Sequence, residues 1–167
     1  RLFLGIIKFI IGFFAKIFYG KSWDPNRQSI IIPEYTYSPW LSDPEFQDIW
    51  TKAKENSRLD IYRGYGLWQA LSQVSHLNGD IIEVGVWRGG SSAILGRKSI
   101  IENIDAKLWL CDTFTGVVKS SDRDEYFMGG EVSDTSAKHV SDLMREVGIN
   151  NYSIVEFSDI IFQDNGY

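Results

Sequence analysis

The chain has 167 residues, of which 44% are hydrophobic, and this is enough to bury one core. A formal net charge of −5 argues against a general nucleic-acid-binding surface. The single cysteine excludes an intramolecular disulfide and a multi-cysteine metal site, and it suits a reducing cytoplasm. The chain begins with Arg1 and stops soon after a strand-like segment, so we expect a fragment of a longer protein.

Residues 2–19 are almost entirely apolar and predict a helix. Lys8 and Lys16 share one narrow arc of it with small residues, and residues 1–23 contain basic residues but no acidic one. At about 1.5 Å per residue the helix approaches the roughly 30 Å of bilayer hydrocarbon, but the two lysines argue against a clean span. A cleaved signal peptide fits poorly for the same reason. We expect a helix in the membrane interface. The alternatives are a true span, or a helix buried against the domain or a partner subunit.

Residues 20–44 contain all four prolines and predict an extended connector or lid, with β character at residues 30–32. A helix should follow, capped by Ser42 or Asp43 and with Pro44 at its first position. A second helical pattern covers residues 59–77.

A short apolar run then carries Ile81, Ile82 and Val84, a pattern suited to a strand buried on both faces. Glycines and a helical pattern follow it directly. A strand, a glycine turn and a helix N-terminus in this order predict a ligand site, because the backbone can approach the ligand closely.

The remaining pattern alternates strands and helices. We expect a helix over residues 91–102, a strand over 107–112, a long loop over 113–133, a helix over 135–147 and a strand over 152–156. This order predicts an α/β fold with a parallel sheet.

The glycine spacing and one acidic residue narrow the ligand class. Gly85 and Asp112 end the first two strands and should reach the same rim of the sheet, where a carboxylate can accept both hydroxyls of a ribose. The alternative is that Asp112 only caps a loop. The spacing Gly85, Gly89, Gly90 matches neither the dinucleotide fingerprint nor a Walker loop. A carboxylate at Glu83, inside the strand, needs partners. It could accept from N–H groups of the turn or orient a cationic methionine group.

Two segments resemble the macrocin O-methyltransferase (TylF-type) family. They are GDIIEVGVWRGGS at residues 79–91 and LCDTFTG at residues 110–116, and the similarity extends over roughly residues 59–156. This resemblance implies a Rossmann-like class I S-adenosylmethionine-dependent methyltransferase sheet, here truncated after the third strand. Several such enzymes methylate sugar hydroxyls. The domains would be an N-terminal helix at 1–20, a connector at 21–44, and the first part of the cofactor-binding domain at 45–167.

The resemblance also implies the contacts of the cofactor. The methionine end would be lined by Glu83, Gly85, Val86, Trp87, Arg88, Gly89, Gly90 and Ser91. Ribose and adenine would be held by Asp112, Thr113 and Phe114. In the family the general base and the aspartates that bind metal follow on later strands, so the catalytic residue is unassigned and Mg²⁺ would be held by residues beyond this chain.

The expected function is an O-methyltransferase acting on a sugar or natural-product hydroxyl. The alternatives are a truncated, membrane-associated domain that only binds the cofactor, and a nicotinamide-dependent oxidoreductase. We expect a cytoplasmic protein, peripheral at the membrane if residues 1–20 bind it, with a small hydroxyl acceptor, no nucleic acid partner and a homo-oligomer as one option. Weaker candidates are a solvated acidic loop, two histidines without a functional role and a small buried Cys111. The loop acids are Asp122, Asp124, Glu131 and Asp134, and the histidines are His76 and His139.

Overall fold

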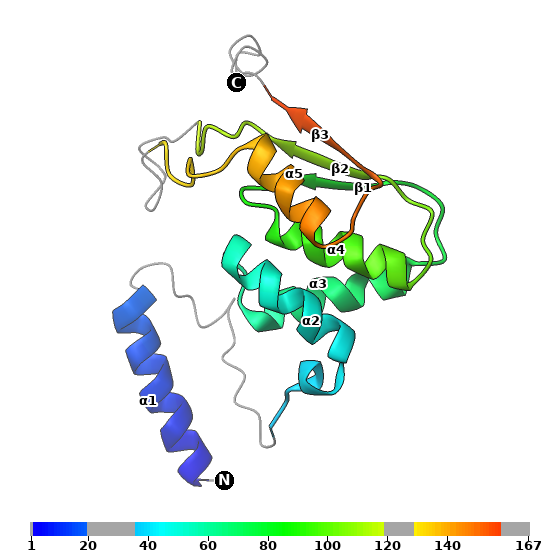
Figure 1. Cartoon of the computed structure of the whole chain (residues 1–167). Helices are drawn as coiled ribbons and strands as arrows, with labels where there is room; N and C mark the ends of the chain where they lie inside the picture. Colours follow the sequence, from blue (N-terminus) through cyan, green and yellow to red (C-terminus); the bar gives the residue numbers. More distant parts are fainter. Residues whose placement is uncertain (1, 20–35, 119–128, 158–167) are drawn as a thin grey trace. The chain divides into compact units, whose positions relative to one another are not determined.

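The computed structural model describes residues 2–19, 36–118 and 129–157, and it divides into two compact units, residues 1–38 and 39–167. Unit 1 contains helix α1 (Leu2–Tyr19). Unit 2 contains four further α-helices, two short 3-10 helices and three strands among its described residues (Figure 1). They are η2 (Pro39–Ser42), α2 (Pro44–Ala53), η3 (Lys54–Asn56), α3 (Ile61–Val74), β1 (Ile81–Val84), α4 (Gly90–Ile101), β2 (Leu108–Asp112), α5 (Ala137–Glu146) and β3 (Tyr152–Glu156).

Helix α1 is predicted correctly. Its Phe9 and Phe13 side chains are exposed, as are those of four other apolar residues, Ile6, Ile10, Phe14 and Ile17. No helix within the described residues is both long enough and apolar enough to cross a membrane. The β character expected at residues 30–32 lies outside the described residues.

Side-chain caps set where the helices of unit 2 begin. Asp43 caps α2 by accepting from the N–H of Phe46 at 3.0 Å, and Pro44 takes the first helical position as predicted. Asp60 caps α3, so this helix starts at Ile61 and ends at Val74, inside the predicted 59–77. Ser136 caps α5, which likewise starts later than predicted.

The three strands form one parallel sheet in the order β1-β2-β3, which confirms the predicted α/β fold. Ile81 pairs with Leu108, and Leu108 pairs with Tyr152. Parallel register brings the carboxyl ends of β1 and β2 to one rim, with Val84 beside Cys111.

The prediction that β1 is buried on both faces is wrong. Ile82 and Val84 are 67% and 70% exposed, while Leu108 and Leu110 on the opposite face of the sheet are buried. The strand order advances in one direction, and right-handed crossovers then place α4 and α5 on the same face (Figure 1). Helices reach the second face of such a sheet only where the strand order reverses.

Helices α2 and α3 pack against α4 and not directly on the sheet (Figure 1). Aromatic side chains form the contact between α2 and α3. The centroid of the Phe46 ring lies 5.6 Å from that of Trp68 and 4.9 Å from that of Tyr65, both edge to face. The buried Trp68 indole N–H donates to Asp43 Oδ2 at 2.9 Å. This aromatic layer fixes the segment between α2 and α3 beside the N-terminus of α4.

Candidate functional site

The turn after β1 requires left-handed backbone at three positions. The φ angles are +87° at Gly85, +50° at Trp87 and +88° at Gly89. Gly89 is the residue before α4, and no side chain caps this helix. Glycine adopts such angles at little steric cost, whereas Trp87 needs other contacts to hold it. No side-chain cap therefore uses the free backbone N–H groups at the N-terminus of α4.

Gly89 and Gly90 serve close packing. A Cβ atom at Gly90 would lie 2.4 Å from the carbonyl oxygen of Ala53 and 2.6 Å from Cβ of Ser57. A Cβ atom at Gly89 would lie 3.2 Å from the Val140 side chain on α5. These two glycines let α4 start between the segment after α2 and helix α5. At Gly85, by contrast, a Cβ atom would meet nothing within 4 Å, so the space beside this residue is open.

Glu83 points from β1 to the first turn of α4. Its two carboxylate oxygens accept hydrogen bonds from the hydroxyls of Ser91 and Ser92. These hydroxyls, and not N–H groups of the turn, are the partners that the half-buried carboxylate requires. Burial raises the pKa of Glu83 above its ordinary value, the two serine bonds oppose this shift, and the negative charge of Asp112 adds to it. Glu83 thus fixes the first turn of α4 on the strand.

Asp112, at the end of β2, joins the two turns of the rim. Its Oδ2 atom accepts from the backbone N–H of Trp87 at 2.8 Å, and its Oδ1 atom accepts from the N–H of Phe114 at 2.9 Å. Trp87 and Phe114 are both left-handed, with φ of +50° and +54°. Asp112 therefore stabilises two uncommon backbone conformations. Each carboxylate oxygen can accept a further bond, so this capping role leaves room for a ligand hydroxyl.

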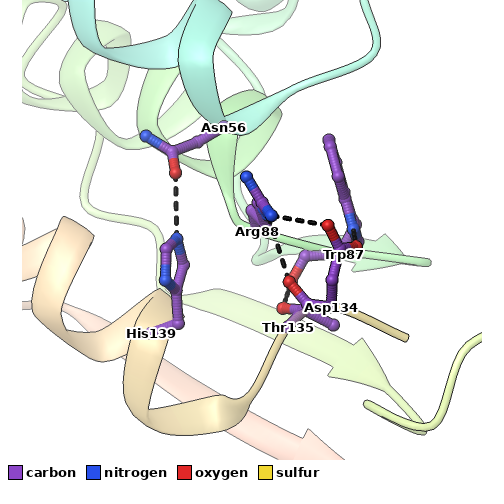
Figure 2. A network of polar contacts seen from close by, with 6 residues as sticks. All are labelled: Asn56, Trp87, Arg88, Asp134, Thr135 and His139. Carbon is purple, nitrogen blue, oxygen red and sulfur yellow. Dashed lines mark hydrogen bonds and ion pairs between the residues drawn. The ribbon is translucent and has the colours of Figure 1, made fainter. Parts of the chain in front are cut away.

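A polar network joins the turn to the loop before α5 (Figure 2). The indole N–H of Trp87 donates to Asp134 Oδ1 at 2.8 Å, and the Arg88 guanidinium pairs with Asp134 Oδ2. The Thr135 hydroxyl donates to the carbonyl oxygen of Trp87. The hydrogen bond from the Trp87 indole holds the pKa of Asp134 below its ordinary value, and the positive charge of Arg88 adds to this effect. The Arg88 side chain is therefore held by Asp134.

A second contact joins η3 to α5 (Figure 2). The Nε2 atom of His139 lies 2.9 Å from the Asn56 side-chain oxygen, so His139 is packed at the surface as expected. Lys52 forms an ion pair with Glu146 at the other end of α5. Both contacts are exposed, and together they join the end of α2 and η3 to α5.

A cavity of about 300 Å³ lies at the carboxyl end of β1. One wall is the turn, and the opposite walls come from the segment between α2 and α3 and from the loop after β2. Its described lining residues are Asn56, Ser57, Arg58, Leu59, Arg63, Gly85, Val86, Trp87, Ser91, Val117 and Val132. Val117 and Val132 are brought together because the N–H of Val117 donates to the Glu131 carbonyl oxygen at 3.0 Å. Apart from its two arginines, the lining contains no charged residue among the described ones.

The residues that were predicted to contact the cofactor fall into two groups in the structure. Gly85, Val86, Trp87 and Ser91 line the cavity. The other predicted residues serve the frame around it. Glu83 supports the first turn of α4, Arg88 pairs with Asp134, and Gly89 and Gly90 allow close packing, while Asp112, Thr113 and Phe114 form the adjoining rim at the end of β2.

The sequence interpretation missed one wall of the cavity. Asn56, Ser57, Arg58 and Leu59 were not predicted as site residues, and neither was Arg63 at the start of α3. A usable signal is the isolated pair of arginines just before and within the helix that precedes the glycine turn, in a chain whose net charge is −5. The two valines of the loop carry no such signal.

The weaker candidates behave as ordinary structural residues where they are described. Cys111 is a free, buried strand residue, as predicted. Asp134 pairs with Arg88, and Glu131 accepts from the N–H of Gly129 at 2.9 Å. Asp122 and Asp124 lie outside the described residues. Within residues 2–19, 36–118 and 129–157, no group of three or more histidine, cysteine or acidic side chains could hold a metal ion.

Comparison with solved structures supports the fold. The structure of the O-methyltransferase NovP superposes with a TM-score of 0.51 and 20% sequence identity, over 60% of this chain and 47% of NovP. The chain thus spans about half the length of that enzyme, and the likeness shows a shared methyltransferase-type fold, in agreement with the predicted Rossmann-like sheet. No curated protein matches the sequence.

The sequence also matches a family as a whole. The model of the macrocin-O-methyltransferase (TylF) family matches residues 64–165, which is more than half of the chain and includes most of α3, the glycine turn, and strands β1 to β3. The residues that form the turn and the rim thus lie inside the matched region. The chain belongs to the macrocin-O-methyltransferase family.

Proposed function

We propose that the cavity at the end of β1 binds S-adenosylmethionine and that the whole protein transfers its methyl group to a hydroxyl of a sugar or natural product. The observation that carries the proposal is the open turn at Gly85, which forms one wall of a cavity of about 300 Å³ in a chain of this family. The methionine part would lie against Gly85, Trp87 and Ser91.

The residues present fit such a cofactor. The space beside Gly85 is open, and α4 begins at this turn without a side-chain cap. Asp112 lies one hydrogen bond from the cavity wall at Trp87 and has acceptor capacity left for ribose hydroxyls. The cofactor supplies an electrophilic methyl group. The protein positions the two reactants, since alignment of an acceptor oxygen with the methyl group accounts for a large part of the rate of a transfer reaction.

Direct titration tests the cofactor. We expect S-adenosylhomocysteine and S-adenosylmethionine to bind the chain in calorimetry and NADH to give no heat, because the glycine spacing does not suit a dinucleotide. Asp112→Ala should strongly lower the affinity for both S-adenosyl compounds. Tight NADH binding with no response to S-adenosylhomocysteine would support the oxidoreductase instead.

Methyl transfer needs a separate assay, because a domain that only binds the cofactor would pass the titration. The whole protein should release S-adenosylhomocysteine when S-adenosylmethionine is supplied with a sugar or polyketide-like alcohol. Binding without product over a broad panel of such alcohols would favour the non-catalytic alternative.

We also propose that helix α1 binds the surface of an anionic membrane. Six apolar side chains of this helix are exposed, Phe9 and Phe13 among them, and the first 23 residues carry only positive charge. This combination suits the headgroup boundary, where apolar side chains enter the acyl region and lysines contact anionic lipids. Sedimentation with phosphatidylserine-containing liposomes should carry the protein into the pellet. Phe9→Glu with Phe13→Glu should leave it in the supernatant, and a wild-type protein found only in the supernatant would refute the proposal.

A further inference from the structure

Arg58 lines the cavity with a positive charge. Its side chain takes no part in the hydrogen-bond network of Trp87, Arg88 and Asp134. It lines the cavity together with Gly85, Trp87 and Ser91, and its side chain is exposed. Within the described residues no acidic side chain forms an ion pair with it, whereas Arg63 pairs with Asp60. Its guanidinium carbon lies 5.7 Å from the centroid of the Trp87 ring.

The backbone of Arg58 is held in place. Arg63 donates from its guanidinium to the carbonyl oxygen of Arg58 at 2.7 Å, and from Nε to Asp60 Oδ2 at 2.7 Å. The Ser57 hydroxyl oxygen accepts from the N–H of Leu59 at 3.1 Å. These bonds fix the residues on both sides of Arg58, while its guanidinium is available to a ligand. The other arginine beside Trp87 differs in this respect, because Arg88 is already paired with Asp134.

The charge of the lining selects the group that Arg58 can bind. Both charged residues among the described lining are arginines, and one of them, Arg63, is compensated by Asp60. S-adenosylmethionine has a sulfonium, an ammonium and one carboxylate. The carboxylate is its only anionic group and therefore the group that a guanidinium attracts most strongly. A planar guanidinium can bind a carboxylate through two parallel N–H···O bonds, which a lysine cannot reproduce.

We propose that Arg58 binds the amino-acid carboxylate of the cofactor and so sets the affinity for its methionine end. This role rests on the proposed function. It predicts that Arg58 distinguishes S-adenosylhomocysteine, which has the carboxylate, from 5′-methylthioadenosine, which keeps the nucleoside and the sulfur but lacks the amino-acid group.

Calorimetric titration of the full chain with these two compounds tests the proposal. Wild-type protein should bind S-adenosylhomocysteine more tightly than methylthioadenosine. Arg58→Met should lower the affinity for S-adenosylhomocysteine by about tenfold or more, the usual range for a charge-assisted bond. The affinity for methylthioadenosine should stay unchanged. Arg58→Lys should recover part of the loss. Lys54→Met removes a positive charge from η3, outside the cavity lining, and should change neither affinity.

The outcomes separate the two proposals. Unchanged methylthioadenosine binding shows that the variant is folded and the nucleoside end intact. If wild-type protein binds both compounds and Arg58→Met weakens neither, or weakens both equally, the carboxylate role is overturned and the cofactor assignment stands. If wild-type protein binds neither compound, the cofactor assignment fails and the role of Arg58 fails with it.

Discussion

Asp112 Oδ2 accepts a hydrogen bond from the backbone N–H of Trp87 at 2.8 Å, which joins the end of β2 to the turn that follows β1. This bond holds Trp87 in a left-handed conformation, with φ of +50°. Asp112 therefore has a structural role whatever it does for ribose. Capping these two turns and binding a nucleoside are compatible roles, because each carboxylate oxygen can accept a further hydrogen bond.

Removing this carboxylate should affect both stability and binding. Asp112→Ala leaves the N–H groups of Trp87 and Phe114 without their acceptor, so we expect a loss of about 1–3 kcal/mol in the free energy of unfolding. Asp112→Asn keeps one carbonyl oxygen and should lose less. Urea unfolding without ligand measures the effect. An unchanged unfolding curve for the alanine variant would show that the two bonds contribute nothing.

The close packing of Gly90 gives a matched pair of glycine variants. Gly90→Ala places a Cβ atom 2.4 Å from the Ala53 carbonyl oxygen and should destabilise the protein by about 1–3 kcal/mol. Gly66→Ala, within α3, meets nothing within 4 Å and should stabilise it by about 0.5–1 kcal/mol. Thermal or urea unfolding of both variants checks the signs. Equal effects would mean that the start of α4 is not packed as described.

The half-buried carboxyl of Glu83 predicts a pH dependence. Its pKa is raised on folding, so its contribution to stability is fully present below the unfolded pKa, near the ordinary value of 4.5, and is lost as pH rises through the folded pKa. Glu83→Gln stays neutral and can still hydrogen-bond the hydroxyls of Ser91 and Ser92. Relative to wild type, its free energy of unfolding should therefore increase as pH rises through this window. If the difference in free energy of unfolding between Glu83→Gln and wild type is constant from pH 4 to 8, the pKa of Glu83 is not raised on folding.

The network of Asp134 should control local motion more than global stability. Asp134→Ala removes the partner of Trp87 and Arg88, and these bonds are exposed, so we expect faster amide exchange in residues 85–91 with a similar unfolding midpoint. Asp142→Ala is the control, because this exposed acid pairs with Lys138 and Arg145 on α5. Exchange that rises equally in both variants would argue against a specific link to the turn.

The sequence predicted the parallel α/β order and the rim formed by Gly85 and Asp112, because both depend on local patterns and on the chain order of strands and helices. It did not predict that one face of β1 is exposed. An apolar run has the same periodicity whether or not helices cover its second face, and here the strand order places both helices on one side.

The arginines mark the wall from Asn56 to Leu59 in the sequence, but no sequence pattern places this wall at the cavity. It reaches the cavity because the aromatic contacts of Phe46 and Trp68 set α2 and α3 against α4, which is a tertiary effect. The partners of Glu83 were mistaken for a similar reason. The serine hydroxyls are within reach only once the first turn of α4 packs above β1.

The most direct test of the cofactor site is a nuclear magnetic resonance titration of the isotopically labelled full chain with S-adenosylhomocysteine. We expect saturable shifts of the backbone amides of Gly85, Val86, Trp87 and Ser91, and of Arg58 and Leu59 on the opposite wall. The amides at the start of β3, at the opposite end of the sheet from the rim, should move little. Saturating ligand that leaves the amides of the turn unmoved, or shifts a different surface, would contradict the assignment of the cofactor site.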